Sequence, residues 1–160
     1  MVVFSIGARP TLRGKYDPHV CERGMEVLLA AIGQCRVEKQ VSKGPYIVAL
    51  STTGISSLGR DIPLAMVPLY KVLLHTPHVD KRAMERLLVE SGEEWTLIRG
   101  SLYTAGPETE GLVREGMEDP VKGVVESAAV GYTISREDVG KWVFENCLQR
   151  TEGEGEVDGG

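Results

Sequence analysis

The chain has few of the features that mark secreted, membrane-bound or nucleic-acid-binding proteins. It has only three cysteines, an odd number, and no secretory signal at its start, so we expect reduced thiols in a cytoplasmic protein. No apolar run reaches the ~20 residues that a membrane-spanning helix needs. The net charge of −5 is mild and has the wrong sign for binding nucleic acid or an anionic membrane. These absences favour a soluble, intracellular protein and by themselves say nothing about its chemistry.

Internal repeats and dividing linkers are also missing. The 160 residues are 42% hydrophobic, which is enough to form one core without disulfide or metal support. We expect a single domain over residues 1–148. The acidic, glycine-rich segment 149–160 has too little apolar surface to bury, so we expect a disordered tail there.

Short apolar runs alternate with helical patterns along the chain. Strands are expected where short runs rich in β-branched or aromatic residues occur, at residues 1–6, 46–50, 95–98 and 130–134, with the first buried on both faces. Helices are expected at residues 17–33, with Asp17 as N-cap and Gly33 as stop, at 63–75 with a break at Pro68, at 80–89 before Gly92, and from the capping residue Ser135 through Cys147. Residues 100–122 read as a loop. The alternation predicts an α/β fold, a Rossmann-like parallel sheet with helices on both faces. Ligands bind such sheets beyond the carboxyl ends of the strands, here residues 7–9, 51–54 and 99–102.

Four segments in this order resemble the later two-thirds of the atypical short-chain dehydrogenases/reductases. The nearest forms are the NmrA-like, NAD(P)H-binding proteins and the flavin/biliverdin-reductase type. The segments are VVFSIGAR at 2–9, YIVALSTTG at 46–54, the stretch 80–99, which is the most specific, and TISREDVG at 133–140. The resemblance implies a NAD(P)-binding, Rossmann-like domain with NADP or NAD as cofactor.

The resemblance also implies roles for the residues after the first strand. Gly7, Ala8 and Arg9 would lie along the phosphates and ribose of the cofactor. Arg9 would pair with a phosphate through charge-assisted hydrogen bonds, and the alternative is an exposed loop arginine.

At the second strand end, Ser51 and Thr52 would lie near the nicotinamide. The resemblance makes Ser51 catalytic, because a hydroxyl there donates a hydrogen bond to a substrate carbonyl oxygen and stabilises negative charge. The alternative is that both hydroxyls satisfy backbone groups at the strand end. Lys81, the second catalytic candidate, would hold the nicotinamide ribose or polarise the carbonyl, or else pair with Glu85 at i+4.

Arg99, Gly100 and Ser101 complete the implied cofactor-binding set. The family usually has arginine followed by proline at this point, and Gly100 replaces that proline here. We therefore expect a looser loop after the third strand.

Two features of the family are missing. Ordinary short-chain dehydrogenases use a tyrosine with a lysine four residues later, whereas Tyr70 is followed by Leu74 at that spacing. The sequence also has no Gly-x-x-Gly-x-x-Gly turn leading to a helix N-terminus that holds the pyrophosphate. We therefore expect an N-terminally truncated domain, short by on the order of 60 residues at ~30 per βα unit. We also expect NADPH binding to be weak or absent.

No metal site is expected. His75 and His78 have no carboxylate or cysteine nearby at ligand spacing. Cys21 and Cys147 are expected in the core and Cys35 on the surface.

Three functions remain open. The first is an atypical NAD(P)H-dependent oxidoreductase that passes hydride to a small carbonyl or enone, with Ser51 and Lys81 in the site. The second is an NmrA-like dinucleotide-sensing module, and the third is a truncated, inactive paralogue. A sheet edge left uncovered by truncation would favour a homo-oligomer.

Overall fold

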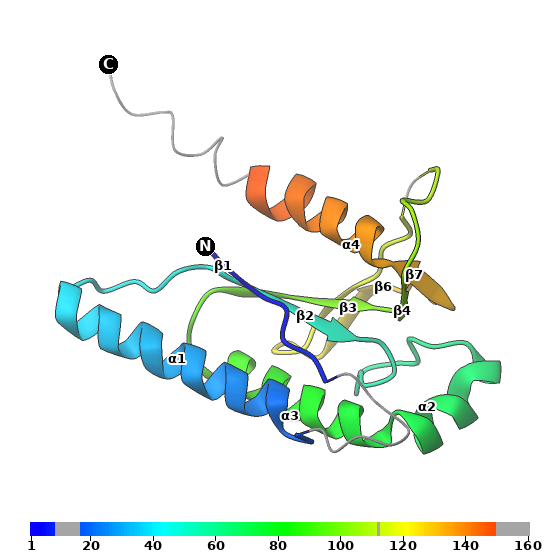
Figure 1. Cartoon of the computed structure of the whole chain (residues 1–160), viewed down its shortest axis with the longest axis horizontal. Helices are drawn as coiled ribbons and strands as arrows, with labels where there is room; N and C mark the ends of the chain where they lie inside the picture. The colour runs from blue at the N-terminus through cyan, green and yellow to red at the C-terminus, as the bar shows by residue number, and fades with distance from the viewer. Residues whose placement is uncertain (9–16, 112, 150–160) are drawn as a thin grey trace.

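The computed structural model describes residues 1–8, 17–111 and 113–149 (Figure 1). Arg9 and residues 150–160, the expected tail after Gln149, lie outside the described residues. The elements in chain order are β1 (Val2–Phe4), α1 (Val20–Lys39), β2 (Ile47–Thr52), η1 (Leu64–Met66), α2 (Val67–Leu73), α3 (His75–Glu90), β3 (Trp95–Gly100), β4 (Leu102–Thr104), β5 (Met117–Asp119), β6 (Val124–Ser127), β7 (Thr133–Ser135), α4 (Arg136–Val143) and η2 (Phe144–Leu148).

The central sheet is parallel and runs in the order β1-β2-β3. Val2 pairs with Ile47 and Ile47 with Trp95, and the β2–β3 register continues to Thr52 and Gly100. Helices α1 and α3 cover one face of this sheet, and α4 covers the other (Figure 1). The predicted α/β class, a Rossmann-like parallel sheet with helices on both faces, is confirmed.

Strand β2 is buried on both faces, as expected for the middle of a parallel sheet. Ile47 and Ala49 pack toward α1 and α3, whereas Val48 packs against Val139 and Val143 of α4. Alternate residues of a strand point to opposite faces, so every second residue after Ala49 faces α3. This alternation orients the side chains where β2 ends.

Strand β1 is less covered than expected. Phe4 is buried, but Val3 is 42% exposed. Val3 pairs with Val48 and so lies on the α4 face of the sheet. α4 packs on Val48 and not on this outer strand, so the prediction of burial on both faces was wrong for β1.

The helix after β1 is longer than the sequence predicted. It continues through Gly33 to Lys39, and Gln40, with a left-handed φ of 53°, ends it. Gly33 is tolerated inside a helix that is held by packing at Ile32. The expected N-cap is also displaced, since His19 takes that position and Asp17 accepts its backbone N–H.

Three further predictions about chain segments need adjustment. The stretch 63–75 is divided into η1 and α2, as a broken helix predicts, but Pro68 lies in the first turn of α2, where a missing N–H costs nothing. α3 begins at His75, earlier than expected, and Gly92 with a φ of +74° follows it. The expected loop at 100–122 contains strands β4 and β5.

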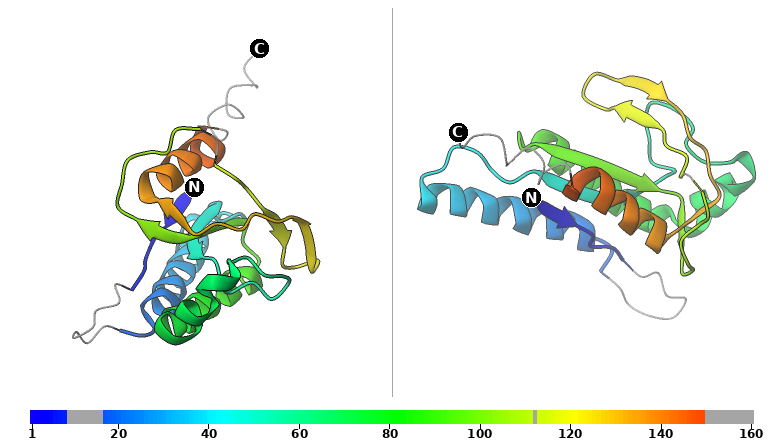
Figure 2. Two further views of the ribbon diagram at one scale, coloured as in Figure 1. Left: turned by 90° about the vertical axis from the view of Figure 1, so that its right-hand side faces the viewer. Right: turned by 90° about the horizontal axis from the view of Figure 1, so that it is seen from above.

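Two small sheets complete the described part of the chain. β4 and β7 form a parallel pair, so the late strand predicted near 130–134 is present but separate from the central sheet. β5 and β6 form an antiparallel hairpin, which stands out in yellow from the body of the molecule in the right-hand view of Figure 2. None of the helices in the described ranges has the length and apolar character needed to cross a membrane.

Candidate functional site

The carboxyl ends of β1, β2 and β3 lie at the same edge of the central sheet. The structure therefore brings most of the predicted residues to one end of the fold. Gly7 and Ala8 follow β1, Ser51 and Thr52 end β2, and Arg99 and Gly100 end β3, while Lys81 reaches this edge from α3. Arg9 lies outside the described residues, so its predicted phosphate contact stays a prediction.

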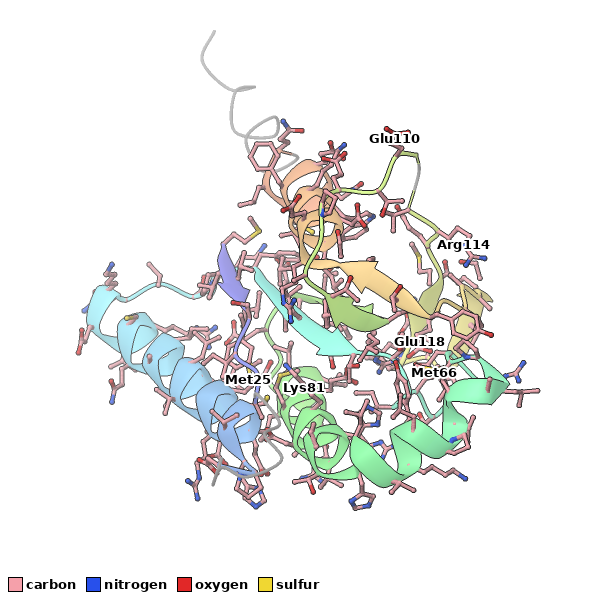
Figure 3. All side chains as sticks on the ribbon, turned by 45° about the vertical axis from the view of Figure 1, so that its right-hand side comes forward. Met25, Met66, Lys81, Glu110, Arg114 and Glu118 are labelled. Atoms are coloured by element: carbon pink, nitrogen blue, oxygen red, sulfur yellow. The ribbon has the colours of Figure 1, made fainter. Side chains whose placement is uncertain are left out.

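Lys81 links two of these strand ends. Its ammonium Nζ donates to the carbonyl oxygen of Ile6 at 2.8 Å and to that of Leu50 at 2.7 Å, and lies 3.7 Å from the sulfur of Met84. Figure 3 shows Lys81 on α3, directed toward the sheet. Two of the three ammonium protons are therefore used to hold β1 and β2 together, and the predicted Glu85 pair is not its main contact.

Burial lowers the pKa of Lys81 from its ordinary value of 10.5, and neighbouring Cys21, Asp80 and Glu85 oppose that shift. Burial also raises the pKa of the Cys21 thiol to about 11. Cys21 is therefore an uncharged core thiol, as the sequence predicted, and its Sγ donates to the Ile6 carbonyl.

Ser51 is the most deeply buried hydroxyl at this edge. Its side chain is 1% exposed, and its Oγ has no hydrogen-bond partner within the part of the chain that the structure describes. By strand alternation it faces α3, as Ile47 and Ala49 do. The alternative that its hydroxyl satisfies a backbone group is not what the structure shows, since buried polar groups normally find a partner and this one does not.

Two more buried polar side chains lie near the end of β2: Thr53, which nothing in the sequence singled out, and His78, which was considered only as a metal ligand. Thr53 is 6% exposed and its Oγ1 is unpaired, and His78 is 6% exposed and its Nε2 is unpaired, both with respect to the described residues. Thr53 lies just past the end of β2, and His78 precedes Lys81 by three residues on α3. The spacing of three places His78 and Lys81 on one face of the helix. The burial of His78, however, depends on contacts with Tyr70 and Gly54 that the sequence does not show.

The Arg99 side chain pairs with two carboxylates, Glu85 and Glu118. Its guanidinium donates to both oxygens of Glu85, at 2.9 and 2.6 Å, and forms a short ion pair with Glu118 of β5. Ser56 donates to the other oxygen of Glu118 at 2.7 Å. This network ties the β5–β6 hairpin to the central sheet, and the predicted cofactor contact of Arg99 stays a prediction.

Tyr103 closes the ends of β2 and β3. Its hydroxyl donates to the carbonyl oxygen of Ser51 at 2.9 Å and accepts the Gly100 backbone N–H. A Cβ on Gly100 would lie 2.5 Å from Cζ of that ring, so any larger residue here would require the Tyr103 ring to move. The loop that was expected to be loose begins with an ordered residue, because Gly100 is the last residue of β3 and pairs with Thr52. The Thr52 hydroxyl donates to the backbone carbonyl oxygen of Thr53. Ser101 is half-buried beside it.

The N-terminus of α1 also points to this edge, but a carboxylate occupies it. Asp80, 1% exposed, accepts the backbone N–H groups of Cys21 and Glu22 at 3.0 and 2.9 Å. A carboxylate on the first N–H groups of a helix satisfies them and matches the positive end of the helix dipole. That end is therefore closed to a second anion such as a cofactor phosphate.

Two curated fungal proteins resemble this chain in sequence. No protein-family model matches the chain. The chain is 39% identical over 158 residues to the reductase pytE of Aspergillus terreus, with 93% of the chain aligned. It is 34% identical over 172 residues to the oxidase pynE of Aspergillus niger, with 92% aligned. The chain spans 57% and 59% of the lengths of these two relatives.

Solved structures show the same fold. A short-chain dehydrogenase/reductase from Veillonella parvula, in complex with NADP, matches with a TM-score of 0.52 and 18% identity over 85% of this chain and 64% of its own. A protein described as an NAD-dependent epimerase/dehydratase from Bacillus halodurans matches with a TM-score of 0.54 and 19% identity, over 93% and 58%. The chain therefore has the Rossmann-like fold of the short-chain dehydrogenases/reductases.

Proposed function

We propose that this chain carries the nicotinamide- and substrate-facing side of an NAD(P)H-dependent oxidoreductase site, of the atypical NmrA-like type. Its substrate is a small carbonyl or enone. The observation that carries the proposal is the buried, unpaired hydroxyl of Ser51 at the carboxyl end of the central strand. The names reductase and oxidase of the two similar fungal proteins, and the NADP bound by a protein of the same fold, support it.

Ser51 performs the step that the chain itself contributes. A bound reduced nicotinamide would supply hydride to the carbonyl carbon, and a proton from solvent would complete the alcohol. As the carbonyl oxygen gains negative charge, the Ser51 hydroxyl donates a hydrogen bond to it, and a donor already fixed in a dry site stabilises that charge more than water does. The Tyr103 hydroxyl, bonded to the Ser51 carbonyl, holds the backbone that positions this donor.

The described residues fit one end of the cofactor better than the other. The unpaired Ser51 hydroxyl suits the nicotinamide half, because it is a buried polar group at the end of the central strand that still lacks a partner among the described residues. Among the described residues the diphosphate has no equivalent partner, since Asp80 already occupies the N-terminus of α1. We therefore assign nicotinamide-side contacts to this chain.

Oxidation of NADPH in the presence of small ketones, enones and quinones tests the proposal, with NADPH supplied at millimolar concentration. We expect NADPH consumption with at least one class of acceptor and a fall of about 10²-fold in kcat/KM for Ser51→Ala, the loss typical of one oxyanion donor. Ser57→Ala is the matched control because Ser57 is exposed on the following loop. Equal rates for the two variants would remove Ser51 from the chemistry.

One observation favours a second candidate, a dinucleotide-sensing module. The charged groups of Lys81 and Arg99 are both engaged within the protein, which suits binding without turnover. In that case the chain binds NADPH, consumes none with any acceptor, and Ser51→Ala leaves the binding constant unchanged. A chain that neither binds nor consumes NADPH corresponds to the inactive alternative.

A further inference from the structure

His78 places a buried, unpaired nitrogen near the end of β2. A buried polar atom without a partner destabilises a fold, so it calls for a ligand or another explanation. Among the described residues Nε2 of His78 has no such partner, although the side chain is more than nine-tenths buried.

The packing around His78 holds its ring against the end of β2. The ring lies 5.3 Å from that of Tyr70, centroid to centroid, with a tilt of 57°. Gly54, with a φ of +87°, makes this approach feasible, because a Cβ there would lie 2.5 Å from Cδ1 of Tyr70 and 3.0 Å from Cε1 of His78. The imidazole therefore contacts the loop that directly follows Ser51.

Helix α3 places His78 beside Lys81, whose ammonium group contacts β2. His78 and Lys81 are three residues apart on α3, so they share a face of that helix. Lys81 donates to the Leu50 carbonyl, one residue before Ser51. Lys81 and His78, from one face of α3, thus contact the end of β2 and the residues that follow it. Lys81 has hydrogen-bond partners there, whereas Nε2 of His78 has none among the described residues.

The charge state of the imidazole suits a neutral hydrogen-bond donor. Burial lowers the pKa of His78 from 6.5, and the charges of Arg82 and His75 lower the pKa further while Asp61 opposes them. At neutral pH the ring is uncharged and carries one N–H, which donates a hydrogen bond without bringing a cation into the site.

We propose that His78 is a substrate-binding residue whose Nε2–H donates a hydrogen bond to the oxygen of the small carbonyl or enone, beside the hydroxyl of Ser51. The inference rests on the proposed function, since it names a second group that binds that function's substrate. A neutral donor held in a buried position stabilises negative charge on the carbonyl oxygen.

Long-range ¹H–¹⁵N NMR spectra of the histidine rings test this without any turnover. The chain has three histidines, and His19 and His75 are exposed, so their signals serve as internal references. The probe is cyclohex-2-enone, and cyclohexene, which has the same ring without the oxygen, is its control. We expect the Nε2 signal of His78 to move with the enone and to stay in place with cyclohexene, while the two reference histidines do not respond.

Variants give a second readout, the dissociation constant of the enone from backbone amide shifts. His78→Gln keeps an N–H donor and retains affinity, whereas His78→Phe weakens binding about tenfold. His75→Gln, on the same helix but exposed, leaves the affinity unchanged. A His78 signal that fails to move, that moves equally with cyclohexene, or a His78→Phe variant that binds the enone normally overturns the inference.

The two proposals fail separately. If NADPH is consumed with enones while the His78 signal stays fixed, only the role of His78 is lost. If the His78 signal responds to the enone but no acceptor consumes NADPH, the oxidoreductase proposal fails and the carbonyl-binding site remains. The NMR measurement on the unaltered chain also holds whatever the stability of the variants.

Discussion

Lys81 joins the carboxyl ends of β1 and β2 through one ammonium group. It donates to carbonyl oxygens of Ile6 and Leu50, and β1 has a neighbouring strand on one side only among the described residues. Hydrogen bonds from a charged donor stabilise a fold by more than neutral ones do. Replacing this side chain with an apolar one of similar length should therefore loosen β1 first.

We expect Lys81→Met to lower the free energy of unfolding by about 1–2 kcal/mol, because two carbonyl oxygens lose a charge-assisted donor while the packing volume is kept. Urea denaturation followed by circular dichroism measures it. Lys71→Met on the exposed side of α2 is the control and should change stability by less than about 0.5 kcal/mol. Similar losses for both variants would mean that Lys81 contributes no more than a surface lysine.

At the scale of elements, the start of α1 depends on a residue of α3. Asp80 accepts two N–H groups in the first turn of α1. We expect Asp80→Ala to cost about 2 kcal/mol, the upper range for a lost cap, since the carboxylate is buried and its partners are left unpaired. Amide hydrogen exchange at Cys21 and Glu22 should accelerate before that of the rest of α1.

Asp17 supplies the matched control for Asp80. It is an exposed aspartate near the same helix end and accepts the His19 N–H. Asp17→Ala should leave the exchange of Cys21 and Glu22 nearly unchanged. Equal effects of the two substitutions would show that the helix start is held by local capping and not by α3.

The start of α4 predicts a pH dependence. Hydrogen bonds from the Thr109 hydroxyl and N–H, and from Ser135, lower the pKa of Asp138 from 3.8 to about 2. Because the folded pKa lies below the unfolded one, this group stabilises the fold fully above about pH 5. That stabilisation declines as the pH falls through 3.8 toward 2.

Thermal unfolding from pH 6 to pH 2 measures this effect. The difference in Tm between the unaltered chain and Asp138→Asn should be constant above about pH 5 and shrink below pH 4. Asp119→Asn serves as comparison, since the pKa of that half-buried carboxyl is lowered mainly by its pair with Lys122. A Tm difference for Asp138→Asn that stays constant down to pH 2 would contradict the shifted pKa.

Features that depend on neighbouring residues in the chain, such as helix caps and apolar strand runs, were predicted correctly in several cases. The Ser135 cap is confirmed, since its hydroxyl accepts the Asp138 N–H at 2.9 Å, and the apolar runs located the strands of the central sheet. Contacts between distant residues were missed. The 59-residue separation of Cys21 and Asp80 leaves no trace in periodicity, so the cap of α1 was assigned to Asp17 instead.

For the site, the sequence predicted the location but not the hydrogen-bond partners of its side chains. Its location at the strand ends follows from topology, which the alternation of elements indicates. The partners of each side chain depend on tertiary packing, so the carboxylates around Arg99 and the carbonyl contacts of Lys81 could not be read from spacing. His78 was considered only as a metal ligand, because burial of its ring depends on Tyr70 and Gly54.

For the molecule as a whole, the contributions of the two halves of a dinucleotide to its binding affinity can be measured separately. The described residues offer the nicotinamide side an unpaired hydroxyl, while the N-terminus of α1 is occupied by Asp80 and that of α4 is capped by Ser135. A diphosphate gains most from open helix N-termini and glycine-rich turns, and the sequence contains no such turn. The affinity of this chain for a dinucleotide should therefore come almost entirely from contacts with the nicotinamide half.

We expect NADPH to bind with a Kd of roughly 1 mM or weaker, about −4 kcal/mol. Reduced nicotinamide mononucleotide lacks the second phosphate of the diphosphate and the adenosine with its 2′-phosphate. It should bind within about threefold of the same Kd because those parts have no partner among the described residues. Titration of both ligands by NMR amide shifts measures the two constants in one experiment. A micromolar Kd for NADPH, or a preference for NADPH of 100-fold over the mononucleotide, would show that this chain holds the diphosphate after all, by groups other than the closed helix ends.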